Sequence, residues 1–84
     1  MPRAEFGAYT QKLRIRAGLS QKQVADRLKL KSGQLVSNWE RGVCYPPLLD
    51  LKELALMYNV NLRILFNQYC YHTKKEDWIR LQQP

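Results

Sequence analysis

The chain has 84 residues and a formal net charge of +7, from 14 Lys and Arg against 7 Asp and Glu. This length provides for one domain with one small hydrophobic core, and the positive surplus favours a polyanionic partner. No stretch approaches the roughly 20 apolar residues of a membrane span, and the N-terminal residues lack the pattern of a secretory signal. These features argue against a membrane protein, and we expect a cytoplasmic location.

The cysteines and the single histidine suggest neither a metal site nor an enzyme. Cys44 and Cys70 are too few for a disulfide framework and are typical of a reducing compartment. Cys70 and His72 are two potential metal ligands close together, but no spaced set completes a zinc site. Paired carboxylates in an apolar setting and a glycine-rich phosphate loop are also missing. We therefore expect no metal, no cofactor and no catalytic residues.

The first predicted helix runs from Ala4 to Ala17. Its apolar face has helical spacing, and Gly18 is placed to end it in a left-handed conformation. The residues on that face are Phe6, Thr10, Leu13 and Ala17, with Tyr9 beside them.

The segment from Leu19 to Gly42 contains two short amphipathic helices joined by a tight turn. Ser20 is a predicted N-cap, and Gln23 three residues later completes a capping box. The turn falls at residues 29–33, where a second cap candidate precedes a glycine. The predicted buried stripes are Val24, Ala25 and Leu28 in the first helix and Leu35, Val36 and Trp39 in the second. The outward side chains of the second helix are Gln34, Ser37, Asn38 and Arg41, an unusual surface for a solvated helix.

The positive charge is concentrated on the same part of the chain. Eight of the 14 basic residues but only two of the 7 acidic residues lie between Lys12 and Arg41. A focused positive field attracts polyanions and raises their association rate. Because this field coincides with a two-helix motif, nucleic acid is favoured over an inert solubilising face.

After Gly42 the pattern predicts a loop and two more helices. Pro47 is placed to start a helix that reaches Asn59, because a proline is well tolerated at the first helical position. Asn61 is a predicted cap for a short helix over residues 62–68. The apolar faces of both helices complete the expected core.

The segment 69–84 is rich in aromatic residues. We expect an extended stretch from Tyr69 to His72, followed by a short helix that Thr73 caps. A small domain does not need so many aromatic residues for its own core, which favours an interface. The alternative is that this segment packs back on the domain.

The motif resembles the helix-turn-helix of the phage repressor and Cro type, a large family of bacterial and phage DNA-binding proteins. The resemblance rests on the order L-S-Q-x-x-V-A-x-x-L, then a turn, then V-S-x-W-E-R-G, with further matches from about Phe6 to Asn67. It implies an all-α fold, with a compact five-helix repressor-like domain over residues 1–68 and a C-terminal extension over 69–84. The chain departs from the family in its turn, which has one additional residue between Leu28 and Val36 and has Lys29 where a glycine is common.

The resemblance implies that the second helix of the motif, about Gly33 to Arg41, lies in the major groove of double-stranded DNA. Candidate base contacts are Gln34, Ser37, Asn38 and Ser32, while Leu35 either touches a thymine methyl group or joins the core. Candidate phosphate contacts are Gln21, Lys22, Lys31, Arg41 and the backbone near Tyr45. The resemblance also pairs Arg14 with Glu40 in a structural ion pair, although Arg14 facing DNA phosphates is an alternative.

A single copy of such a domain reads about four base pairs, too few to select a genomic site. The usual solution in this family is a homodimer on a two-fold operator, and we expect the same here. The candidate interface residues are Leu62, Phe66, Tyr69, Tyr71, Trp78 and Ile79. The predicted function is that of a small transcriptional regulator, a repressor or autoregulator, without a small-molecule ligand. The alternative is an antitoxin or phage accessory protein that acts mainly through protein partners.

Overall fold

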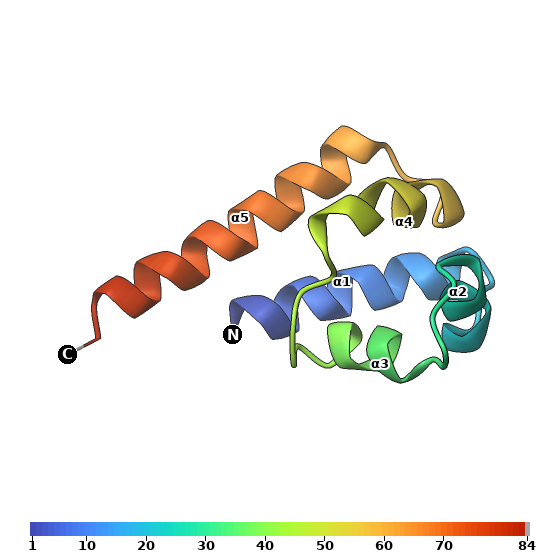
Figure 1. Ribbon diagram of the computed structural model, residues 1–84. Coiled ribbons are helices and arrows are strands. Elements are labelled where there is room, and N and C mark those ends of the chain that lie inside the picture. The colour runs from blue at the N-terminus through green and yellow to red at the C-terminus, as the bar shows by residue number, and fades with distance from the viewer. Residues whose placement is uncertain (84) are drawn as a thin grey trace.

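The computed structural model describes residues 1–83, and all regular elements in this part of the chain are helices (Figure 1). The α-helices are α1 (Pro2–Arg16), α2 (Gln21–Arg27), α3 (Gln34–Glu40), α4 (Leu51–Met57) and α5 (Leu62–Leu81), and a 3-10 turn, η1 (Leu48–Asp50), precedes α4. The expected all-α fold with five helices is confirmed.

The helix ends follow from local sequence. Ser20 and Gln23 form the expected reciprocal capping box at the start of α2, with hydrogen bonds of 3.0 and 2.7 Å. The side chain of Asn61 accepts hydrogen bonds from two backbone N–H groups in the first turn of α5. Gly42, just after α3, has a φ of +80°, which is the left-handed conformation that its position predicts.

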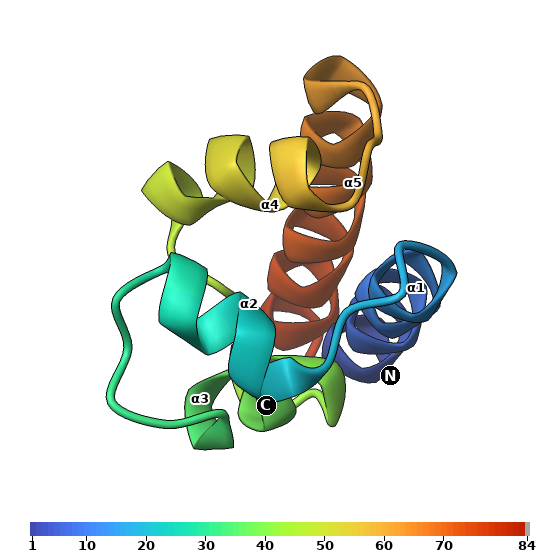
Figure 2. The same ribbon diagram turned by 90° about the vertical axis from the view of Figure 1, so that its right-hand side faces the viewer.

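One hydrophobic core joins the five helices. In Figures 1 and 2, α4 lies above α2 and α3, while α5 runs past α4 and alongside α1. Helix α1 is the central support, since it packs against both α3 and α5. The largest fully buried side chains are Phe6, Leu51, Leu54, Leu65, Val24 and Val36.

The end of the chain differs from the sequence prediction. The extended stretch expected from Tyr69 to His72 is wrong, because α5 continues through these residues without a break as far as Leu81. Thr73 caps no helix; its hydroxyl donates to the carbonyl of Tyr69 one turn earlier. The rings of Tyr69 and His72 lie 5.8 and 5.9 Å from the ring of Phe6 in α1. This packing on the core favours a continuous helix through these residues.

The fourth helix also starts differently from the prediction. Pro47 is not its first residue, because η1 lies between Pro47 and the first turn of α4.

Among the described residues, no helix is both long and apolar enough to cross a membrane.

Candidate nucleic-acid interface

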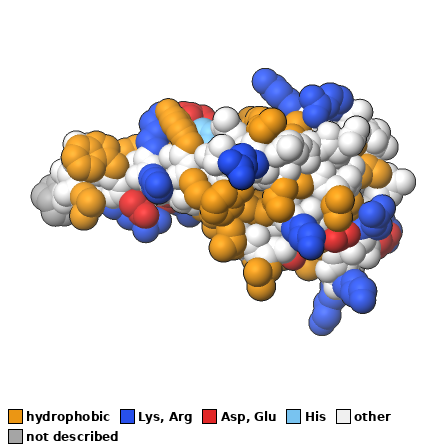
Figure 3. All heavy atoms as spheres, turned by 90° about the horizontal axis from the view of Figure 1, so that it is seen from above, with side chains coloured by type: hydrophobic (Ala, Val, Ile, Leu, Met, Phe, Trp, Pro, Cys, Tyr) orange, Lys and Arg blue, Asp and Glu red, His pale blue; other side chains and the backbone are white. Residues whose placement is uncertain are grey.

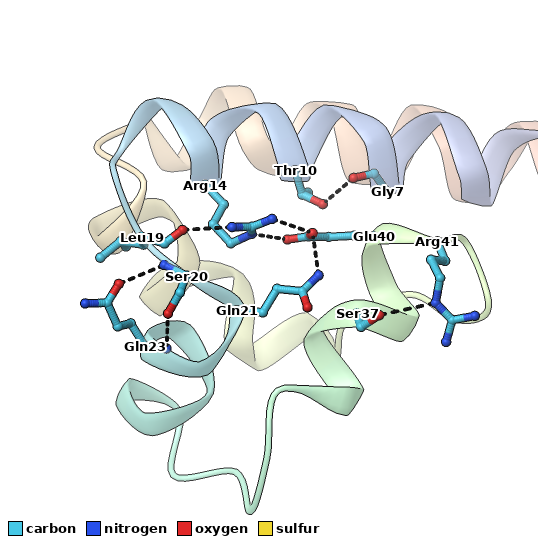
Figure 4. A network of polar contacts seen from close by, with 10 residues as sticks. All are labelled: Gly7, Thr10, Arg14, Leu19, Ser20, Gln21, Gln23, Ser37, Glu40 and Arg41. Atoms are coloured by element: carbon cyan, nitrogen blue, oxygen red, sulfur yellow. Dashed lines mark hydrogen bonds and ion pairs between the residues drawn. The ribbon is translucent and has the colours of Figure 1, made fainter.

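An ion pair between Arg14 in α1 and Glu40 in α3 anchors the end of α3 (Figure 4). The guanidinium donates two hydrogen bonds to the carboxylate, of 2.7 and 3.1 Å, in the side-by-side arrangement that Arg and carboxylate groups favour. The Arg14 side chain is 12% exposed and that of Glu40 3% exposed. The hydrogen bond from Arg14 to Glu40 raises the pKa of Arg14, so the guanidinium remains charged. Its predicted structural role is consistent with this geometry, and the guanidinium is engaged inside the domain.

The same pair holds α2 in place. Arg14 donates a third hydrogen bond, of 2.8 Å, to the carbonyl of Leu19 just before α2. The side chain of Gln21, at the start of α2, donates to the Oε1 atom of Glu40 at 3.0 Å, the same oxygen that accepts the 3.1 Å hydrogen bond from Arg14 (Figure 4). The Gln21 amide nitrogen therefore has an internal partner.

Two glycines allow α1 to approach α3 closely. A Cβ atom on Gly7 would overlap the backbone carbonyl oxygens of Trp39 and Glu40. A Cβ atom on Gly42 would lie 2.7 Å from the backbone of Ala4. Only glycine fits at these positions without moving the helices apart. The close approach at Gly7 was not predicted, since a glycine inside a helix carries no local signal of a tertiary contact.

The two faces of α3 differ in burial and in composition. Its buried side chains are Val36, Trp39 and Glu40, which join the core and the ion pair. The opposite face carries the predicted base contacts Gln34, Ser37 and Asn38, followed by Arg41. These four side chains contact one another through hydrogen bonds between Gln34 and Asn38, between Arg41 and Asn38, and between Arg41 and Ser37. The predicted reading residues are thus brought together on one exposed surface.

The turn before α3 contains a residue with a left-handed backbone. Lys29 has a φ of +60°, which explains why a glycine is common at this position. Leu30, which follows it, packs partly against the core. Ser32 faces the start of α3, where its hydroxyl accepts a hydrogen bond of 3.3 Å from the backbone of Gln34. Leu35 is 37% exposed, so it lies at the edge between the core and the outer surface.

The predicted phosphate contacts differ in how exposed their side chains are. Lys31 and Arg41 are exposed, and Lys22 is exposed beside Asp26 at 3.6 Å. The side chain of Tyr45 cannot reach a phosphate, because its ring packs against Phe6 and its hydroxyl is fully buried. Burial also raises the pKa of Tyr45, so the phenol stays neutral. Only the backbone near this residue remains available to DNA.

The comparison with known families agrees with this geometry. The sequence profile described as helix-turn-helix matches residues 11–65, well over half of the chain. The chain belongs to the repressor and Cro type helix-turn-helix family. This family consists of DNA-binding transcription regulators. Among curated proteins, no significant relative was found. The matched region extends from the middle of α1 into α5, so it contains the whole of the motif and its anchoring ion pair.

The predicted dimer residues do not lie on one surface. Tyr69 is packed against Phe6, whereas the other five are exposed. Successive helical residues are about 100° apart, so Phe66 and Tyr71 point roughly 140° away from each other. Leu62 and Phe66 line a groove of about 700 Å³ together with Leu48, Leu49, Leu51, Lys52, Arg63 and Asn67. Figure 3 shows hydrophobic side chains gathered in the middle of the face seen from above, with a separate group toward the far left end.

Within residues 1–83, no group of three or more His, Cys, Asp or Glu side chains is arranged to hold a metal ion. Cys44 and Cys70 are both free thiols.

Proposed function

We propose that this protein binds double-stranded DNA sequence-specifically as a small transcriptional repressor or autoregulator, with α3 in the major groove. The observation that carries the proposal is the outward face of α3, where Gln34, Ser37 and Asn38 form a polar surface beside Arg41. Amide and hydroxyl side chains of this kind hydrogen-bond to base edges. The buried face of the same helix is fixed by Glu40, so the reading groups are held on a rigid support.

Exposed cations and a helix end supply contacts to the DNA backbone. Lys22, Lys31 and Arg41 flank the reading surface, and the start of α2 presents free N–H groups beside Gln21. If the two copies of a dimer neutralise about six phosphates, the logarithm of the binding constant should fall with the logarithm of salt concentration with a slope of about −5.

A homodimer supplies the second half-site. We propose that the groove around Leu62 and Phe66 receives the equivalent surface of a second copy. This groove is apolar, and none of its residues belongs to the reading surface of α3. One domain alone contacts too few base pairs for genomic selectivity, and two copies on a two-fold operator double the contacts. The exposed Tyr71 and Trp78, on another side of α5, are matched controls.

The DNA proposal is tested by selecting bound fragments from random DNA with the purified protein and measuring affinity at several salt concentrations. We expect one enriched two-fold sequence and a steep salt dependence. Gln34→Ala and Asn38→Ala should weaken binding to the selected sequence by about tenfold each and leave binding to random DNA nearly unchanged. A slope near zero, or no enriched sequence, would contradict the proposal.

The dimer proposal is tested by sedimentation of Phe66→Glu and of the control Trp78→Glu. A charge inside an apolar interface is strongly unfavourable, so Phe66→Glu should be monomeric and bind the two-fold site weakly. Trp78→Glu should dimerise as the parent protein does. If the parent protein binds DNA but sediments as a monomer, the groove instead serves a different protein, as in an antitoxin or phage accessory protein.

A further inference from the structure

The hydrogen bonds among the side chains of α3 restrict what each reading group can offer to DNA. The amide nitrogen of Gln34 donates to the Oδ1 atom of Asn38 at 3.0 Å. Arg41 donates to the same oxygen at 2.6 Å and to the hydroxyl of Ser37 at 3.2 Å. Arg41, one turn beyond the reading residues, therefore ties Ser37 and Asn38 together.

The orientation of the Asn38 amide follows from the chemistry of its partners. A guanidinium has only donors, so the group of Asn38 that faces Arg41 must be its oxygen. A carbonyl oxygen has two lone pairs, and here Gln34 and Arg41 engage both. The Nδ2 group, with its two hydrogens, is what Asn38 has left to present to DNA.

This arrangement separates Gln34 from Asn38 in what they can read. Paired recognition of adenine needs a donor for N7 and an acceptor for the N6 amino group. Gln34 keeps both, because only one hydrogen of its amide nitrogen is used and its oxygen has no partner within the described side chains. Asn38 keeps only donors, so it is restricted to acceptors such as guanine O6 and N7, adenine N7 or thymine O4, and it cannot accept from the N6 amino group of adenine.

A hollow beside Asn38 distinguishes between these acceptors. It has a volume of about 340 Å³ and is lined by Leu30, Lys31, Ser32, Gln34, Leu35 and Asn38. Leu30 and the partly exposed Leu35 give it apolar walls. In the major groove, thymine presents the O4 acceptor and a methyl group on the same edge, whereas guanine and adenine have no methyl group.

We propose that Asn38 reads thymine, donating from Nδ2 to O4 while the thymine methyl group enters the hollow between Leu30 and Leu35, and that Arg41 is the positioning residue that fixes this orientation. The inference rests on the proposed function, because it concerns how the same DNA surface selects its sequence. It gives Arg41 an effect on base choice in addition to any contact with phosphate.

The base position read by Asn38 is located first. Fragments are selected from random DNA with the parent protein and with Asn38→Ala, and the position that loses its preference in the variant is the one that Asn38 reads. We expect thymine there in the parent selection, preferred over adenine by about tenfold or more. Adenine at this position would overturn the inference, because its paired recognition uses the occupied oxygen of Asn38 and it has no methyl group to enter the hollow.

The hollow is tested by replacing that thymine with uracil, which keeps O4 and lacks the methyl group. Burial of one methyl group predicts that affinity falls about fourfold. The same replacement at a thymine outside the region contacted by α3 is the control and should change affinity by less than about twofold. Equal affinity for thymine and uracil at the Asn38 position would contradict the role of Leu30 and Leu35.

The positioning role is tested with Arg41→Ala and the control Lys22→Ala. Each removes one positive charge from each copy of the dimer and should reduce the magnitude of the salt slope by about two. Only Arg41→Ala removes the 2.6 Å hydrogen bond to the Asn38 oxygen and frees one of its two lone pairs, so it alone should lower the preference for thymine over adenine to about threefold or less. An unchanged preference would remove Arg41 from base selection while leaving DNA binding intact. If DNA binding by the parent protein does not depend on salt concentration, the proposed function and this inference are both wrong.

Discussion

The buried ion pair between Arg14 and Glu40 is best tested by removing one partner only. In Arg14→Met, Glu40 stays at the end of α3 but loses two hydrogen bonds, of 2.7 and 3.1 Å. Its side chain is 3% exposed, so water cannot replace them without opening the core. Hydrogen bonds to charged groups contribute about 1.5–3 kcal/mol each, which predicts a loss of about 3–6 kcal/mol in the free energy of unfolding. This agrees with the usual cost of about 3–5 kcal/mol for breaking a buried pair.

Such a loss is large for a domain of this size. Stabilities of single domains are about 5–15 kcal/mol, so Arg14→Met should lower Tm by about 20 °C or leave the chain largely unfolded. Urea unfolding followed by circular dichroism measures the change. The stability of Arg14→Lys should lie between that of the parent protein and that of Arg14→Met, because a lysine keeps the charge but not the paired donors.

A double substitution separates a stranded charge from lost packing. Arg14→Met with Glu40→Leu removes both charges and should recover most of the stability, since an apolar pair of similar volume is often as stable as a buried ion pair. The reasoning is refuted if Arg14→Met costs less than about 1 kcal/mol, or if the double variant is no more stable than the single one.

Three further predictions concern the backbone and one buried histidine. Gly7→Ala should destabilise the fold by about 3 kcal/mol or more in thermal unfolding, because the overlap with the carbonyls of α3 outweighs the better helix propensity of alanine. The control Gly18→Ala has open space around the added Cβ atom at a φ of +74° and should cost only about 1 kcal/mol. Lys29→Gly should stabilise the fold by about 0.5–1 kcal/mol by relieving the left-handed backbone, and Lys29→Ala, which retains the strain, should not; equal stability of the two would contradict this. Burial lowers the pKa of His72 below its ordinary value of 6.5, so the unfolded chain binds the proton more readily. The contribution of neutral His72 to stability is therefore complete above about pH 6.5 and decreases as pH falls from there toward the lower folded pKa. Over that range, unfolding curves of the parent protein should diverge from those of His72→Gln. Parallel pH profiles of the two proteins would disprove the assignment.

Sequence reasoning succeeded where the determinant is local or belongs to the motif. The capping box at Ser20 and Gln23 and the left-handed Gly42 depend on residues within one turn of each other, so they can be read directly. The Arg14 and Glu40 pair spans 26 residues and was accessible only through the family resemblance. Its geometry then follows from the packing of α1 against α3.

Three of the missed features depend on contacts between distant segments. Nothing near Gly7 indicates that α3 passes within contact distance of it. The aromatic residues 69–72 favour an extended backbone by local preference, yet packing of Tyr69 and His72 on Phe6 holds them in α5. The inward direction of the Tyr45 side chain has the same origin, since its ring joins this cluster 5.7 Å from the ring of Tyr69.

This aromatic cluster changes how the role of α5 can be studied. Removing residues 68–84 would leave Phe6 without two of its ring neighbours, so a truncated chain would lose core packing as well as any interface. Single substitutions at exposed positions avoid this difficulty, and the same reasoning applies to α3. Because Gln34 is exposed and is not part of the hydrophobic core, Gln34→Ala should change the free energy of unfolding by less than about 0.5 kcal/mol while altering the selected DNA sequence. A large loss of stability in this variant would show that the reading face also supports the fold, and its DNA phenotype could then not be assigned to base contacts.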